Sequence, residues 1–204
     1  MNQTEPQPKF SVVTVVHEQS SDVTAALAPI LAQTCDAYEV IVVNENPSAE
    51  MLDELNALRQ RHHNLYTTFL PHYQFQKNRR RLAFSLGSRA SRGEWHVYAD
   101  IDGATPPADW LEGLLPGCDG DNVLQLGYAD RKTGCVRWDA YFDVSQAARH
   151  IIRAERWRAG VGRDAWQRRF RPLTRYDYMA VTAEYAPALL QIMAQDPKTV
   201  FAKK

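Results

Sequence analysis

The sequence lacks the features that define several common classes of protein. Its three cysteines are odd in number and form no CxxC pair, which argues against a disulfide framework or a zinc site. No apolar run reaches the roughly 18 residues that a membrane span requires. Lysine and arginine, 24 together, balance 24 aspartates and glutamates, so the net charge favours no nucleic-acid partner. These absences leave a globular protein with reduced thiols.

Familiar catalytic signatures are missing as well. The chain holds no glycine-rich phosphate loop, no HExxH motif and no Ser-His-Asp order. Its first nine residues are polar, include two prolines and lack the apolar stretch of a signal peptide. We therefore expect a disordered lead-in over residues 1–9 and a cytoplasmic location.

The chain does have the composition and periodicity of an α/β domain. Apolar residues make up 45% of its 204 positions, enough to form one sizeable core. Short β-branched runs alternate with segments whose apolar residues recur at helical spacing. Such alternation predicts a mainly parallel central sheet with helices on both faces. The predicted strands are residues 10–16, 38–43, 65–69 and 95–99, and the predicted helices are residues 23–31, a segment that starts after Ser48, and residues 78–91.

The pattern is less regular after Pro107. No linker rich in Gly, Pro or Ser interrupts the chain, so we interpret residues 10–115 and 116–204 as two halves of one domain. In the second half we predict strands at 122–128 and 178–182, extended chain at 135–144, and helices at 109–115, 145–159 and 183–194.

Polar residues follow three of the predicted strands, at His17–Gln19, Asn44–Asn46 and Asp100–Asp102. In α/β sheets, ligands bind at the carboxyl ends of the strands. Asp100 and Asp102 are two residues apart and point to the same side, so their carboxylates repel unless a cation or hydrogen-bond donors balance them. A hard divalent ion such as Mg²⁺ or Mn²⁺ suits this pattern. The competing interpretation, and the commoner one for an isolated pair, is that both simply end a strand and cap a turn.

Six motifs occur in an order and spacing that resembles family 2 glycosyltransferases. The resemblance covers about residues 9–115 and implies a GT-A fold, a nucleotide-diphospho-sugar donor, a divalent metal (Mn²⁺ or Mg²⁺) and inverting transfer to an acceptor hydroxyl. It would make the first half of the chain the nucleotide-sugar-binding half and the second the acceptor side. The motifs are Ser11–Val16, Leu31–Thr34, Tyr38–Val43, Arg89–Glu94, Asp100–Asp102 and Pro106–Leu111.

The resemblance also implies roles for particular residues in donor binding. Glu45 matches the acidic position that meets the nucleobase, although Asn44 replaces its usual acidic neighbour. His17 and Glu18 match the first loop, which contacts the base or ribose. The resemblance assigns the remaining contacts as follows: the ribose to Asp100, the metal and diphosphate to Asp102, and the diphosphate to basic residues that include Arg79 and Arg81.

The sequence does not identify the general base of the reaction clearly. An inverting transfer needs a carboxylate that takes the acceptor proton, and the family often carries it in a Glu-Asp pair. This chain contains no Glu-Asp dipeptide. We prefer Asp177, which lies between two tyrosines ahead of a predicted strand, and the alternatives are Asp139, Asp143 and Glu184.

The missing pair keeps other functions open. One alternative is a catalytically inactive nucleotide-sugar-binding protein of the same fold. Another is a sugar-phosphate nucleotidyltransferase, although such a protein normally has a glycine-rich basic loop directly after its first strand, where this chain has His17–Gln19.

Residues 149–175 hold nine arginines interleaved with Trp157, Trp166 and Phe170. Three interpretations compete. The segment can be a solvated helix whose aromatics pack on the core. It can instead contact an anionic membrane surface, which would suit a lipid-linked acceptor and a peripheral location at the inner membrane. The third interpretation is recognition of the donor diphosphate or an anionic carbohydrate acceptor by arginine.

Overall fold

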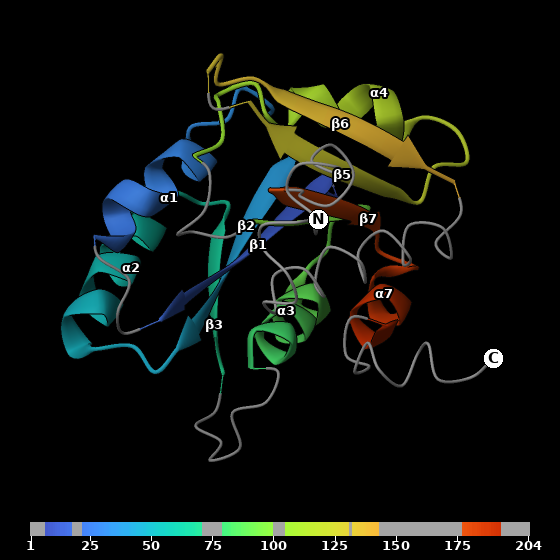
Figure 1. Ribbon diagram of the computed structural model, residues 1–204. Coiled ribbons are helices and arrows are strands. Elements are labelled where there is room, and N and C mark those ends of the chain that lie inside the picture. Colours follow the sequence, from blue (N-terminus) through green and yellow to red (C-terminus); the bar gives the residue numbers. More distant parts are fainter. Residues whose placement is uncertain are drawn as a thin grey trace, which may run out of the picture.

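The computed structural model shows a seven-stranded sheet between two layers of helices (Figure 1). The strands lie in the order β3-β2-β1-β4-β7-β5-β6. This confirms the predicted α/β class with helices on both faces. The structure describes residues 7–17, 22–70, 79–99, 105–130, 132–142 and 177–192.

One half of the sheet is parallel, as the sequence predicts. β1 pairs with β2 and β4, and β2 pairs with β3, all in parallel register. β1 and β2 are rich in valine and almost wholly buried, which is typical of strands covered on both faces. The strands are β1 (Phe10–His17), β2 (Tyr38–Glu45), β3 (Leu65–Leu70) and β4 (Trp95–Tyr98).

The other half of the sheet is antiparallel. The sequence pattern does not predict this arrangement. β5 (Leu124–Ala129) and β6 (Val136–Tyr141) form a hairpin whose turn contains Gly134 at φ 73°. β7 (Tyr178–Thr182) lies between β4 and β5 and runs antiparallel to both. A strand from late in the chain therefore joins the two halves of the sheet.

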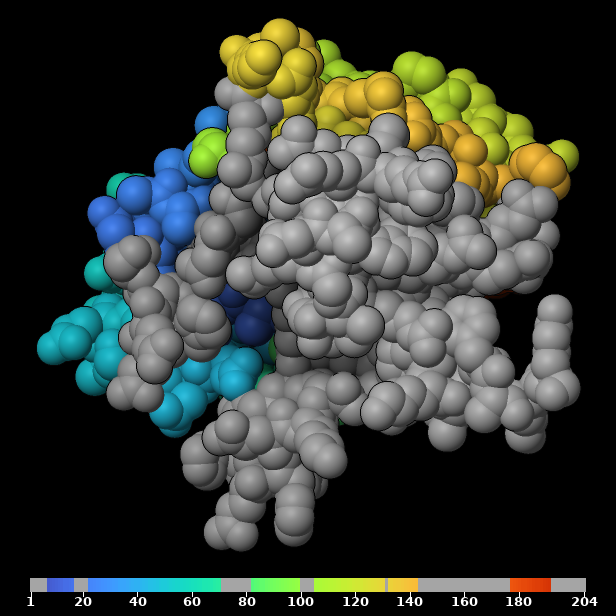
Figure 2. Space-filling view, in the orientation of Figure 1, coloured from blue at the N-terminus to red at the C-terminus, as the bar shows by residue number. Residues whose placement is uncertain are grey.

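The helices divide between the two faces. α1 (Val23–Leu31) and α2 (Ala49–Arg61) cover one face, and α3 (Arg79–Ala90) and α7 (Ala186–Ile192) cover the other (Figure 1). In the space-filling view, α1 and α2 lie at one side of the molecule and the β5–β6 hairpin lies at the top (Figure 2). Every helix in the described parts of the chain is too short or too polar to cross a bilayer.

Side-chain hydrogen bonds cap the amino ends of α1 and α2. The Asp22 carboxylate accepts a hydrogen bond from the amide of Ala25 at 2.9 Å. The Ser48 hydroxyl accepts one from the amide of Met51 at 3.2 Å. Both are N-caps, which satisfy amide groups that the first helical turn leaves without partners.

The described segment after β4 differs from the predicted helix at 109–115. It forms the 3₁₀ turn η1 (Glu112–Leu114) and then the short α4 (Leu115–Cys118). The Gln33 side chain explains the later start, because its oxygen accepts from the amide of Leu111 at 3.1 Å and its nitrogen donates to the Pro107 carbonyl at 2.8 Å. These bonds fasten the segment beside the end of α1.

Other differences lie near the chain ends. Lys9, assigned to the lead-in from the sequence, donates its amide to the Ala37 carbonyl at 2.7 Å, so the described part of the lead-in is tied to the sheet. α7 starts at Ala186, three residues later than predicted, after a turn closed by Tyr185 and Thr182. Residues 1–6 and the predicted helix over residues 145–159 lie outside the described residues.

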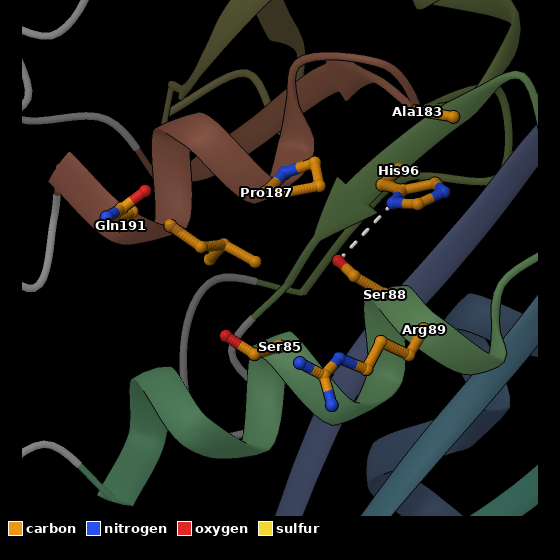
Figure 3. A pocket seen from close by; sticks show the side chains of 8 residues that line it. Ser85, Ser88, Arg89, His96, Ala183, Pro187 and Gln191 are labelled. Carbon is orange, nitrogen blue, oxygen red and sulfur yellow. Dashed lines mark hydrogen bonds between the residues drawn. The ribbon is translucent and has the colours of Figure 1, made fainter.

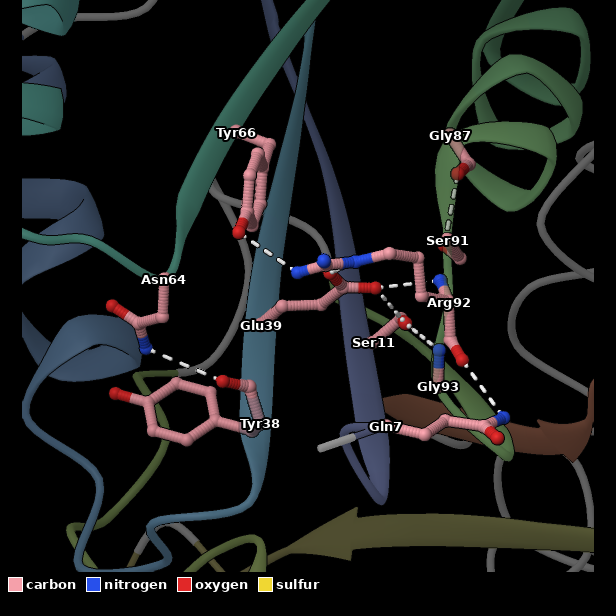
Figure 4. Close-up of polar contacts among 10 residues, drawn as sticks. All are labelled: Gln7, Ser11, Tyr38, Glu39, Asn64, Tyr66, Gly87, Ser91, Arg92 and Gly93. Carbon is pink, nitrogen blue, oxygen red and sulfur yellow. Dashed lines mark hydrogen bonds and ion pairs between the residues drawn. The ribbon is translucent and has the colours of Figure 1, made fainter. Parts of the chain in front are cut away.

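A buried polar network anchors the chain where it enters β4 (Figure 4). Glu39 on β2 is 2% exposed, and its carboxylate accepts from the Ser11 hydroxyl at 2.6 Å. The same carboxylate accepts from the Arg92 amide at 2.6 Å and its guanidinium at 2.9 Å. The Arg92 guanidinium also donates to the Tyr66 hydroxyl at 2.8 Å and lies over that ring. The turn between α3 and β4 is therefore fixed to three strands.

Candidate functional site

The sheet brings strand ends from distant parts of the chain to one edge. His17 and Glu45, the last residues of β1 and β2, are register partners. Ala99, just beyond β4, donates its amide to the Val13 carbonyl at 3.1 Å and so continues alongside β1. Because β7 is antiparallel to β4, its first residues lie at this same edge, and Asp177 precedes them. We call this the carboxyl edge.

Asn44 and Glu45 form the described part of the predicted nucleobase site. Asn44 is 5% exposed, and its side-chain oxygen has no hydrogen-bond partner in the described structure. A buried acceptor without a donor costs free energy, which a ligand N–H at this position would recover. Glu45 follows at the strand end and is half-buried. Asn46 then turns the chain with φ 54°.

The predicted acidic pair, Asp100 and Asp102, lies outside the described residues. Glu18 also lies outside them, as does the side chain of His17. The chain is nonetheless fixed on both sides of residues 100–104. On one side is the bond between Ala99 and Val13, and on the other are the bonds that Gln33 makes beyond Thr105.

The candidates for the general base lie in different places. One carboxylate oxygen of half-buried Asp177 accepts from the Ala129 amide at 2.9 Å, which orients the group at the carboxyl edge. Asp139 lies in the middle of β6 and forms an ion pair with Arg137 at 3.3 Å. Glu184 follows β7 at the opposite edge, where Thr182 pairs with Trp95, the first residue of β4. The structure thus brings Asp177 toward the predicted donor residues and leaves Glu184 away from them. Asp143 lies outside the described residues.

The amino end of α3 approaches the carboxyl edge. α3 follows β3 and packs on β1, β2 and β3, with Gly87 against Val13. A Cβ at Gly87 would collide with the Val13 side chain, so the glycine sets the close approach of helix to sheet. Arg79 opens the helix, but the side chains of Arg79 and Arg81 lie outside the described residues.

The described residues alone do not make a metal centre. Among them no group of three His, Cys, Asp or Glu side chains is placed to hold an ion. Glu45 and the free oxygen of Asp177 are the kind of ligand that Mg²⁺ and Mn²⁺ accept, but Asp102, the predicted ligand, lies outside the description. Metal binding therefore remains a proposal about Asp102.

Two features of the site escape sequence reasoning. Gln33 belongs to one of the family motifs, but nothing local signals that it fastens the segment beyond Asp102. Behind Asp177, the rings of Tyr178, Trp110 and Trp138 pack together, with centroids 4.7 Å apart for Trp110 and Tyr178. Only the antiparallel placement of β7 brings these rings together.

The sheet order and the two helical layers define a GT-A-like α/β fold. The family model described as glycosyl transferase family 2 matches residues 11–171. The chain belongs to glycosyl transferase family 2. No curated protein matches it significantly.

Two solved structures share the fold, and a third is similar to a shorter part of the chain. A mannosyltransferase from Pyrobaculum calidifontis, PcManGT, in complex with GDP-Man and Mn²⁺ is 15% identical, with a TM-score of 0.58 over 91% of this chain and 47% of its own. WbbM, a bifunctional glycosyltransferase, is 14% identical, with a TM-score of 0.52 over 95% and 36%. TarS from S. aureus in complex with UDP-GlcNAc is 20% identical, with a TM-score of 0.46 over 57% and 33%. The chain spans between a third and a half of these proteins.

Proposed function

We propose that this chain transfers a sugar from a nucleotide-diphospho-sugar donor to an acceptor hydroxyl, with inversion and with the help of Mn²⁺ or Mg²⁺. The observation that carries the proposal is the carboxyl edge, where the family-matched ends of β1, β2 and β4 lie together with Asp177. The solved mannosyltransferase of similar fold binds GDP-Man and Mn²⁺, which supports a donor of this class.

The donor would lie across this edge. Its base would meet Glu45 and Asn44, whose unpaired side-chain oxygen can accept an N–H from a nucleobase. The ribose would meet Asp100, and His17 and Glu18 would line the base or ribose. Arg79 and Arg81 would contact the diphosphate from the start of α3.

The metal would be held by Asp102, and when bound it supplies positive charge that stabilises the departing diphosphate. Arginine side chains add to this charge. No other step depends on the ion in this proposal.

Asp177 is the proposed general base. The Ala129 amide holds one of its oxygens and leaves the other, among the described residues, free to take a proton. The acceptor oxygen would then bond to the anomeric carbon as the bond from that carbon to the diphosphate breaks. Asp139, already paired with Arg137, and Glu184, at the opposite edge, are less suited to this role.

Donor binding can be tested apart from turnover. Titration calorimetry with UDP and with GDP should show binding that strengthens when Mn²⁺ is added. Asp102→Asn should abolish the effect of Mn²⁺, while Asp109→Asn, an exposed position further along, should keep it. An absence of binding at millimolar nucleotide would overturn the proposal.

Measurement of the transfer rate tests whether Asp177 is the general base. Purified protein, donor and a panel of carbohydrate acceptors should release nucleoside diphosphate. Asp177→Asn should lower the rate by a factor of about 10² or more, since general-base catalysis contributes about that much. Asp139→Asn is the matched control and should retain activity. A rate unchanged in Asp177→Asn would remove this residue from the mechanism.

The alternative is a catalytically inactive protein that binds nucleotide sugars. Two observations favour it: the chain has no Glu-Asp dipeptide, and an amide already engages one oxygen of Asp177. This alternative predicts nucleotide binding without release of nucleoside diphosphate with any acceptor.

The proposals for the acceptor and for the location of the protein rest on the composition of residues 149–175, which lie outside the described residues. Their arginines and tryptophans support a cytoplasmic protein that binds peripherally to the inner membrane surface and acts on a lipid-linked carbohydrate in polysaccharide biosynthesis. The protein should sediment with vesicles containing 30% anionic lipid and not with neutral vesicles. Equal sedimentation with both would contradict the membrane contact.

A further inference from the structure

A cavity of about 380 Å³ lies between α3 and α7 (Figure 3), toward the amino ends of the parallel strands rather than at the carboxyl edge. Its volume falls within the range of small-molecule sites. β4 contributes to the cavity through His96, which pairs with Ser11 and Val181 near the amino ends of the parallel strands. The cavity is therefore separate from the proposed donor site. Its lining includes Ser85, Ser88, Arg89, His96, Pro187 and Leu190.

The polar groups of the cavity are held in place by buried partners. His96 is 5% exposed, and its Nδ1 lies 3.3 Å from the Ser88 hydroxyl. That hydroxyl also bonds to the Tyr98 hydroxyl beneath it. Burial lowers the pKa of His96, so the imidazole is neutral at pH 7 and offers hydrogen bonding without charge. Rigid partners of this kind favour a defined ligand orientation.

Arg89 supplies the only charge among the described residues that line the cavity. Its guanidinium extends along α3 toward the cavity (Figure 3) and forms no ion pair or hydrogen bond in the described structure. Of the described acids at this end of the sheet, Glu94 is paired with Lys9 and Glu39 with Arg92, and Glu184 follows the lining residue Ala183. Opposite Arg89, α7 presents the apolar side chains of Pro187 and Leu190.

We propose that this cavity binds a small organic carboxylate. Its anionic group would pair with Arg89, whose planar fork matches two carboxylate oxygens. Its apolar body would lie between α3 and α7 against Pro187 and Leu190. The hydroxyls of Ser85 and Ser88 would receive any further polar group of the ligand. Binding here does not depend on the proposed transferase function.

Three probes of similar size and different charge test the proposal. Benzoate is anionic, benzyl alcohol is neutral and benzylamine is cationic. In ¹H–¹⁵N spectra of the whole chain, benzoate should shift the amides of Ser88, Arg89 and Ala183 in a saturable manner. Benzyl alcohol should bind at least tenfold more weakly, and benzylamine should leave these amides unmoved. Equal shifts with all three probes, or none with benzoate at 20 mM, would overturn the proposal.

Variants separate charge from shape. Arg89→Gln should weaken benzoate about tenfold, while Arg59→Gln, an exposed arginine in the last turn of α2, should not change it. Ser85→Met fills the cavity and should prevent binding of both benzoate and benzyl alcohol although Arg89 is present. If benzoate binds Arg89→Gln as it binds the unaltered chain, Arg89 only complements the carboxyl end of α3 and the assignment fails.

Discussion

Cys118 and Cys135 show how burial of a single side chain sets its reactivity. Cys135 is exposed, whereas burial raises the pKa of the Cys118 thiol to about 11. At pH 8 only about one Cys118 thiol in a thousand is then ionised, and the thiolate is the reactive form. Iodoacetamide should therefore modify Cys135 first and Cys118 last, with Cys35, whose pKa burial also raises, in between. Peptide mapping over time measures the order, and equal rates for Cys118 and Cys135 would contradict it.

His96 makes stability depend on pH. Burial lowers its pKa below 6.5, and the Glu39 carboxylate opposes this shift only in part. The unfolded chain therefore binds a proton more readily than the folded one. The free energy of unfolding should fall as pH decreases through 6.5 toward the folded pKa. His96→Gln should show a smaller loss between pH 7.5 and pH 5 in urea denaturation. The exposed His63→Gln should show the full loss, and identical profiles for the two variants would exclude His96 as the cause.

At the scale of elements, the close packing of α3 against the sheet depends on one glycine. Gly87→Ala places a methyl group against Val13 and, at 3.1 Å, against Val43. We expect a loss of about 1–3 kcal/mol, although alanine favours helices, because overpacking moves helix and strand apart. Gly113→Ala is the control, since its Cβ would make an ordinary contact with Trp138 at 3.4 Å. Urea denaturation compares the two, and equal stabilities would show that α3 can shift freely.

The turn before β4 relies on an ion pair between the buried Glu39 carboxylate and the half-exposed Arg92 guanidinium. Arg92→Ala leaves the buried Glu39 carboxylate without its charged partner and should cost about 2 kcal/mol, less than in a fully buried pair because the Arg92 side chain is 48% exposed. Lys9→Ala breaks the exposed pair with Glu94 and should cost under about 1 kcal/mol. Thermal unfolding of both variants measures the difference. A similar small loss in each would mean that Glu39 is satisfied by Ser11 and the Arg92 amide alone.

The sequence predicts the parallel half of this fold because its signals are local. The valine-rich strands β1 and β2 are apolar on both faces, and Asp22 and Ser48 are recognisable N-caps. Nothing local tells β7 to insert between β4 and β5, since five residues of apolar chain can pair with any open edge. The late start of the 112–118 segment likewise depends on Gln33, which is 78 residues from its hydrogen-bond partner Leu111 in the chain.

The candidate site, like the fold, is predictable from the sequence only where its signals are local. The polar ends of β1 and β2 follow from strand polarity, and the structure places His17 beside Glu45. The unpaired oxygen of Asn44 is visible only when its neighbours are known. The sequence favours Asp177 over Glu184 only through its flanking tyrosines. That Asp177 lies at the carboxyl edge and Glu184 at the opposite one follows from the antiparallel placement of β7.

For the whole molecule, donor binding should raise stability by mass action. With nucleotide and Mn²⁺ at one hundred times the dissociation constant, the folded state gains about 2.7 kcal/mol. Thermal unfolding should then shift upward for the unaltered chain and for Asp109→Asn. In Asp102→Asn the part of the shift that needs Mn²⁺ should disappear. A shift that Mn²⁺ does not affect in any of the three proteins would argue against a metal at Asp102.

The position of β7 also governs how the chain must be made. A ribosome releases β4 and the β5–β6 hairpin well before residues 178–182 emerge, yet those residues are the shared neighbour of both pieces. Until then the nascent polypeptide exposes two open strand edges that invite mispairing. Vectorial synthesis thus postpones closure of the sheet until residues 178–182 have left the ribosome. A polypeptide stopped before residue 177 should need chaperones or aggregate.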